Sequence, residues 1–182
     1  MKRLVALLIV LVLLPLCAHA EIEKIAVPCE TGVCFYWWPK MPTLKGWHHD
    51  RDHSYMYSAN AQAPDGYTFA NAESVIYVKA LYKPRIPEIK SMDSLISDDK
   101  EQFMSQDPSL SISEVTSLTT ADGQLLKSYT FFPKEKGNWE QASYGEEGDF
   151  YLIFTLSSRS QEGYQKVLDA YKQFISTYKA KP

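Results

Sequence analysis

The segment WHHDRDH at residues 47–53 contains the side chains best suited to chemistry. Imidazole and carboxylate groups together suit zinc, copper or nickel ions. In an extended chain His49 and His53 face the same way, but they are roughly 13 Å apart at the backbone, which is too far to hold one ion. A metal site at His48, His49 and His53 would therefore need a helical turn, a bent loop or ligands from elsewhere in the chain.

Two other interpretations of this segment stay open. Arg51 stands in its middle and repels a cation, which favours a polar loop that leads into the following strand. A catalytic histidine is the other alternative, because imidazole can act as a general acid or base. We expect no resident cofactor, with a transition metal at the histidines as the alternative.

Cys29 and Cys34 lie in the segment PCETGVC at residues 28–34, where Gly32 can make a tight turn. In an oxidising compartment such a pair is expected to form a disulfide. A redox-active pair is the alternative, but that chemistry normally uses two intervening residues, and this pair has four. We therefore predict a structural disulfide.

Familiar catalytic motifs are missing from the sequence. It has no Gly-x-Ser-x-Gly elbow, no His-Glu-x-x-His motif and no glycine-rich phosphate loop. Residues 97–100 (SDDK) match Ser-x-x-Lys only in form, and we expect them on a solvated helix face. Glu146 and Glu147 are adjacent in a turn and point apart, so they do not form an acid–base pair. We assign no catalytic residue and expect that the protein is not an enzyme.

A group of large aromatic side chains lies early in the chain. Its members are Phe35, Tyr36, Trp37, Trp38 and Trp47. If exposed, such rigid surfaces could bind a partner protein or a sugar ring. If buried, they would fill the core beside the Cys29–Cys34 loop, and we favour this second interpretation.

The start of the chain has the pattern of an export signal. Lys2 and Arg3 precede an apolar run over residues 4–14, and Ala18 and Ala20 are the small residues expected before a cleavage site. The run is shorter than the about 20 residues that a membrane-spanning helix needs. We predict a signal peptide at residues 1–20, no transmembrane segment after its cleavage, and a periplasmic or secreted protein.

Composition excludes several classes of protein. The chain has 182 residues, of which 45% are hydrophobic and 23% charged, so long disorder and collagen-like repeats are excluded. A net charge of −3 without a basic stripe argues against nucleic acid as a partner. Residues 21–182 are enough to bury one core and contain no linker, which predicts a single domain.

Hydrophobic patterns predict the elements that must position these residues. Strands are predicted at residues 54–63, 74–82, 112–118, 125–132, 139–144 and 150–156, with a hairpin turn at residues 121–124. Helices are predicted after Ser91 and after Ser160, because apolar residues recur at helical spacing behind each serine. The pattern indicates an α+β fold in which a mid-chain helix and a C-terminal helix cover an antiparallel sheet.

The element order over about residues 91–178 resembles the PsbP-like family. The resemblance rests on the first helix, the hairpin around Asp122 and Gly123, the strands at Trp139 and at residues 150–156, and the closing helix at residues 164–178. That family includes photosystem and Ran-binding accessory proteins and bacterial envelope proteins. The resemblance implies an α/β/α sandwich and a binding or accessory role, and it carries over no functional residue.

These features predict an exported, non-enzymatic accessory or binding protein of the cell envelope, whose partner is a protein or a small ligand. The alternatives are a metal-binding envelope protein that uses residues 48–53, and a hydrolase with an unrecognised site. Polar groups of shifted pKa that converge in a pocket would count against a role without catalysis.

Overall fold

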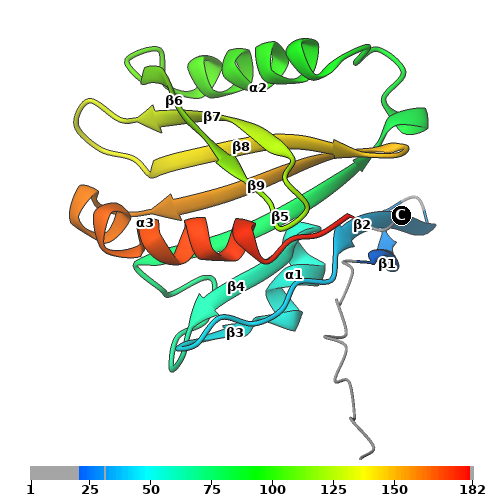
Figure 1. Ribbon diagram of the computed structural model, residues 1–182, viewed down its shortest axis with the longest axis horizontal. Helices are drawn as coiled ribbons and strands as arrows, with labels where there is room; N and C mark the ends of the chain where they lie inside the picture. The colour runs from blue at the N-terminus through cyan, green and yellow to red at the C-terminus, as the bar shows by residue number, and fades with distance from the viewer. Residues whose placement is uncertain (1–20, 31, 181–182) are drawn as a thin grey trace, which may run out of the picture.

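An antiparallel sheet of nine strands forms the centre of the computed structural model, which describes residues 21–30 and 32–180 (Figure 1). The predicted signal peptide at residues 1–20 lies outside the described residues. The strands are β1 (Ile22–Cys29), β2 (Gly32–Pro39), β3 (Trp47–His49), β4 (Asn60–Pro64), β5 (Ser74–Tyr82), β6 (Ser111–Thr119), β7 (Leu125–Phe132), β8 (Trp139–Glu147) and β9 (Phe150–Ser158). The helices are α1 (Arg51–Tyr57), α2 (Met92–Gln106) and α3 (Gln161–Ser176), with a short 3₁₀ helix at Lys83–Arg85. In this part of the chain, no helix is long and apolar enough to cross a membrane.

The strand order along the sheet is β1-β2-β5-β9-β8-β7-β6, and β4 pairs with β5 on the same side as β2, with β3 beyond it. Strands β5, β9 and β8 are central and pair along their full lengths. Side chains of a strand alternate between the two faces of a sheet. On β9, Phe154 and Leu156 pack in the core with α3, whereas Tyr151 and Ile153 pack in the core with α2. We call these surfaces the α3 face and the α2 face.

Helix α3 begins after Ser160, whose hydroxyl accepts a hydrogen bond from the Gly163 amide at 3.0 Å. This bond satisfies one of the free amides at a helix start. Apolar residues then recur at helical spacing, so Tyr171 and Phe174 are fully buried against the sheet. The Tyr171 hydroxyl donates to the carbonyl of Phe154 at 2.9 Å, which ties the helix to the central strand. Figure 1 shows α3 lying across the front of the sheet.

Helix α2 begins with a reciprocal pair of hydrogen bonds. The Ser94 amide donates to the Ser91 hydroxyl at 3.1 Å, and the Ser91 amide donates to the Ser94 hydroxyl at 3.0 Å. Leu95 and Ile96 then pack in a core with side chains of β7, β8 and the first residues of β9. Tyr151, near the start of β9, belongs to this core, but the residues at the far end of β9 do not. The helix therefore covers only part of the α2 face.

The predicted α+β class with an antiparallel sheet is confirmed. The predicted strands at residues 74–82 and 125–132 coincide with β5 and β7, and both predicted helices begin directly after their serine caps.

The prediction of a strand over residues 54–63 is wrong for its first half, because residues 51–57 form α1. The carboxylate of Asp50 accepts a hydrogen bond from the His53 amide at 3.2 Å and caps this helix. Ser58, with a left-handed φ of 54°, ends it. Tyr55 and Tyr57 are both exposed, so their spacing does not reflect burial on one face of a strand. The expected polar loop before this segment is also wrong in part, since residues 47–49 form β3.

The predicted disulfide between Cys29 and Cys34 is confirmed. Strands β1 and β2 form a hairpin that brings the two Cα atoms to 5.8 Å, within the usual range for this bond. The bond therefore closes the end of the hairpin at the edge of the sheet.

Removing this bond should cost about 2 kcal/mol of unfolding free energy, because it closes only a short loop in the unfolded chain. Urea unfolding of the chain from Glu21, with and without a reducing agent, measures the difference. The Cys29→Ser/Cys34→Ser variant should match the reduced protein and ignore the reducing agent. Equal stability of the oxidised and reduced wild type would contradict the prediction.

Candidate functional site

Two adjoining cavities lie on the α2 face, at the end of the central strands that α2 leaves uncovered. Their volumes are about 310 Å³ and about 300 Å³. Both are lined by Tyr77, Lys79 and Glu140, so they form one continuous depression, which we call the central groove. Helix α2 forms one side of the groove. Helix α1 and the loop around Phe69 form the other side.

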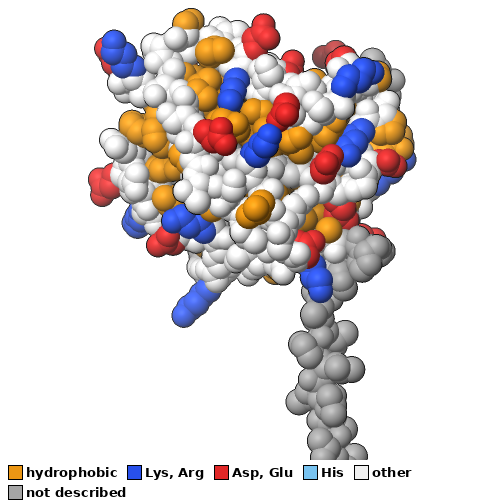
Figure 2. Space-filling model, turned by 45° about the horizontal axis from the view of Figure 1, so that its top comes forward, with side chains coloured by type: hydrophobic (Ala, Val, Ile, Leu, Met, Phe, Trp, Pro, Cys, Tyr) orange, Lys and Arg blue, Asp and Glu red, His pale blue; other side chains and the backbone are white. Residues whose placement is uncertain are grey.

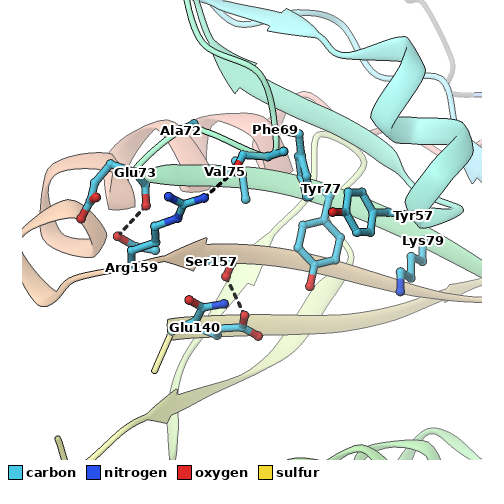
Figure 3. A pocket seen from close by; sticks show the side chains of 13 residues that line it. Tyr57, Phe69, Ala72, Glu73, Val75, Tyr77, Lys79, Glu140, Ser157 and Arg159 are labelled. Carbon is cyan, nitrogen blue, oxygen red and sulfur yellow. Dashed lines mark hydrogen bonds between the residues drawn. The ribbon is translucent and has the colours of Figure 1, made fainter. Parts of the chain in front are cut away.

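The floor of the central groove is polar because of strand register. Glu140 of β8 lies opposite Ser157 of β9, and Tyr77 of β5 lies opposite Thr155 of β9. Residues opposite each other on antiparallel strands point to the same face. The Ser157 hydroxyl donates to the Glu140 carboxylate at 2.6 Å, which Figure 3 shows on the floor of the groove.

Two carboxyl groups of the groove are held away from water. Burial raises the pKa of Glu140, and the hydrogen bonds from Ser157 and Asn138 offset this only in part. Burial likewise raises the pKa of Asp99 on α2, against the opposing effects of a hydrogen bond from the Tyr144 hydroxyl and of the Lys79 charge. Both carboxyls are therefore biased toward the protonated form, in which they can donate a hydrogen bond.

Lys79 lines both cavities of the groove. Among the described residues its ammonium group makes no hydrogen bond or ion pair, and the nitrogen lies 5.9 Å from the centre of the Tyr77 ring. The side chain is only partly exposed. A half-buried ammonium without an acceptor is a natural contact for a ligand oxygen.

Three aromatic rings form a wall at one end of the groove. The ring centroids of Tyr57 and Phe69 are 5.1 Å apart, and those of Phe69 and Tyr77 are 5.7 Å apart in an edge-on arrangement. Figure 3 shows these rings beside one another, with Tyr77 on the same strand as Lys79. The groove thus combines an aromatic wall with a hydrogen-bonding floor.

Asp50 holds this wall in place. One carboxylate oxygen accepts from the Phe69 amide at 2.8 Å and lies 2.8 Å from Nδ1 of His53, while the other accepts from the His53 amide. Burial acts to raise the pKa of Asp50, but these hydrogen bonds outweigh it, and the pKa is lowered. The ring of His53 in turn stacks on Tyr57, with centroids 6.1 Å apart. Part of the histidine-rich segment therefore supports the groove.

The other two histidines of the segment have separate neighbours. Nδ1 of His48 lies 3.7 Å from the carboxylate of Asp65, and Nε2 of His49 lies 2.9 Å from the hydroxyl of Ser54. Nowhere in the described residues do three or more His, Cys, Asp or Glu side chains gather in a way that could hold a metal ion. The metal site at His48, His49 and His53 stays a prediction.

The early aromatic group is divided between the core and its margins. Trp38 is buried, with 2% of its surface exposed, whereas Phe35, Tyr36, Trp37 and Trp47 are half-buried. Trp37 and Trp47 pack against the core under α3, and the ring of Trp37 lies 5.1 Å from that of Tyr82. None of the five lines the central groove.

The groove residues were missed by the sequence analysis. Asp99 was expected on a solvated helix face as part of residues 97–100, but it is half-buried and accepts from Tyr144. A signal was present in β5, where Tyr77 and Lys79 interrupt an apolar run at a spacing of two. That spacing indicates one polar stripe on a buried strand, whereas no local pattern marks Glu140.

The raised pKa values predict a specific pH dependence. The folded protein binds these protons more tightly than the unfolded chain, so their stabilising effect is present at low pH. It is lost as pH rises from the ordinary values, 3.8 for Asp99 and 4.5 for Glu140, through the raised ones. Each unit of raised pKa corresponds to about 1.4 kcal/mol at neutral pH.

The Glu140→Gln/Asp99→Asn variant should therefore be more stable than the wild type at neutral pH, with the advantage shrinking toward acid. Urea unfolding between about pH 4 and about pH 9 measures this difference. Glu101→Gln, at an exposed position of the same helix, is the control and should show no such trend. A difference that does not change with pH would contradict the prediction.

In the comparisons with known proteins, no family model matches the chain, and the search of curated proteins found no significant match.

Proposed function

We propose that this chain is an exported binding protein of the cell envelope that holds a short saccharide, or a similar polyhydroxylated molecule, in the central groove. The observation that carries the proposal is the pairing of an aromatic wall with a floor of polar groups, among them the buried Glu140 and Ser157 and the half-buried Lys79.

Sugars fit this combination because a pyranose has an apolar face and a rim of hydroxyl groups. Aromatic rings such as Tyr57 and Phe69 offer a flat surface for the apolar face. Each hydroxyl both donates and accepts, so it is best met by amides, carboxyls and an ammonium together. Besides the floor residues, the groove is lined by Asn138, Gln102 and Gln106, whose amides can donate and accept at once.

The balance of charge favours a neutral ligand over a strongly charged one. The lining contains the acidic Glu73, Asp99 and Glu140 and the basic Lys79 and Arg159. On the face that Figure 2 shows, acidic and basic side chains are interspersed, with no region of a single sign. Neither an anion nor a cation would be drawn in by a field of one sign.

The export part of the proposal rests on the predicted signal peptide at residues 1–20 and is supported by the disulfide between Cys29 and Cys34. The PsbP-like architecture is also a proposal. The packing of α2 and α3 on alternate residues of β9 supports a three-layered α/β/α sandwich.

One observation favours a second candidate, a glycoside hydrolase. Such enzymes use two carboxyl groups, one of them with a raised pKa. Asp99 and Glu140 are two carboxyls of raised pKa in the same groove. This alternative retains the saccharide and adds its cleavage.

Calorimetric titration with glucose, maltotetraose and chitotetraose tests the proposal. At least one should bind the wild type. Tyr57→Ala should weaken binding about threefold to tenfold through the lost ring contact. Lys79→Met should weaken it about tenfold or more, since a hydrogen bond to a charged group is lost.

Lys45→Met, at an exposed position outside the groove, is the matched control and should bind as the wild type does. Absence of binding by all three saccharides, or equal binding by Lys79→Met, would contradict the proposal. If the wild type releases new reducing ends from a saccharide and Glu140→Gln does not, the protein is a hydrolase and the non-enzymatic role is wrong.

A further inference from the structure

A third cavity, of about 240 Å³, lies between the β1–β2 hairpin and α1. It shares no lining residue with the central groove. Its lining includes Trp38, His49 and Arg51, together with apolar side chains of Ile25 and Met41. The cavity therefore joins two residues of the histidine-rich segment, His49 and Arg51, to the aromatic group near the start of the chain.

The indole nitrogen of Trp38 has no hydrogen-bond partner in the described part of the chain, although the side chain is only 2% exposed. A buried donor left without an acceptor costs about 1–3 kcal/mol. Trp38 lines this cavity and does not line the central groove. An acceptor that reaches this nitrogen from the cavity would satisfy the indole N–H.

Whereas Trp38 offers a hydrogen-bond donor, His49 offers an acceptor. The single hydroxyl proton of Ser54 is donated to the carbonyl of Asp50 at 2.8 Å. The Ser54 oxygen must then accept from Nε2 of His49, as it accepts from the Ala61 amide at 2.9 Å. Nε2 therefore holds the proton, which leaves Nδ1 of His49 as an acceptor. Burial, and then the charge of Arg51, lower the pKa of His49 and favour this neutral form.

Arg51 supplies the charge for an anion. Its side chain is exposed, and within the described residues it makes no ion pair or hydrogen bond. Lys40, the other cation of the lining, is already paired with Glu21 at 3.1 Å and Glu23 at 3.7 Å. A guanidinium group binds a carboxylate through two parallel hydrogen bonds, which makes Arg51 suited to that group.

We propose that this cavity binds a small organic carboxylate with a neighbouring hydroxyl group. The carboxylate accepts hydrogen bonds from Arg51 and from the indole nitrogen of Trp38. The hydroxyl donates to Nδ1 of His49. The apolar part of the ligand packs on Ile25 and Met41.

Mandelate, an aromatic hydroxycarboxylate, is the probe, and nuclear magnetic resonance of the ¹⁵N-labelled protein is the readout. Trp38→Phe identifies the Trp38 indole resonance. Mandelate should move that resonance downfield to saturation, because a donor shifts this way when it gains an acceptor. The indole of Trp139, which packs in the core beside Phe132, should not move.

A variant of Arg51 and an analogue of mandelate test the contacts of Arg51 and His49 separately. Arg51→Gln should weaken mandelate binding about tenfold or more. Phenylacetate lacks the hydroxyl that donates to His49 and should bind the wild type about threefold to tenfold more weakly than mandelate. Arg85→Gln, at another exposed arginine, is the control and should leave mandelate binding unchanged. Thermal unfolding checks that each variant is folded.

A Trp38 resonance that mandelate does not move, up to the limit of its solubility, would overturn the proposal. So would equal binding by Arg51→Gln and the wild type. A strong magnetisation transfer from water to the Trp38 indole that mandelate leaves unchanged would also overturn it, because a bound water would then be the acceptor.

Discussion

Strands β5, β8 and β9 are central in the sheet. On both of their faces, apolar side chains must be shielded from water and buried polar groups must find hydrogen-bond partners. This constraint shapes the rest of the molecule. On the α3 face apolar side chains such as Phe154 meet the buried face of a helix. On the α2 face the helix covers only one end of the strands. At the other end the strands bear Glu140, Ser157 and Tyr77, which have hydrogen-bonding groups of their own. Buried polar groups need partners, so this end remains a lined groove and is not filled by apolar packing.

The groove depends in turn on Asp50, which links a local helix cap to a distant loop. The same carboxylate caps α1 through His53 and accepts from the amide of Phe69. Because Tyr57 belongs to α1 and Phe69 to the loop, one side chain fixes both parts of the aromatic wall. The histidine-rich segment is thus divided in its roles. His53 supports the central groove, while His49 lines the separate cavity beside Trp38.

Much of the fold could be predicted from the sequence, because its elements depend on local patterns. The serine caps at Ser91 and Ser160 and the apolar run of β5 are local signals, and the elements begin where they indicate. The strand expected at residues 54–63 failed because alternation of Tyr55 and Tyr57 is equally compatible with an exposed helix, and the Asp50 cap decided between the two. The groove could not be predicted, because Glu140 and Tyr77 meet only through the pairing of β8, β9 and β5, and Asp99 reaches them from a helix.

The central claim is that the uncovered end of β5, β8 and β9 is where the protein binds its ligand. Chemical-shift mapping of backbone amides, during titration of the labelled protein with the three saccharides, tests this claim most directly. The account predicts that the largest changes fall at Val75–Lys79 on β5, at Glu140–Ala142 on β8 and at Thr155–Ser157 on β9. Shifts that cluster elsewhere on the molecule, or none with any of the three saccharides, would contradict it.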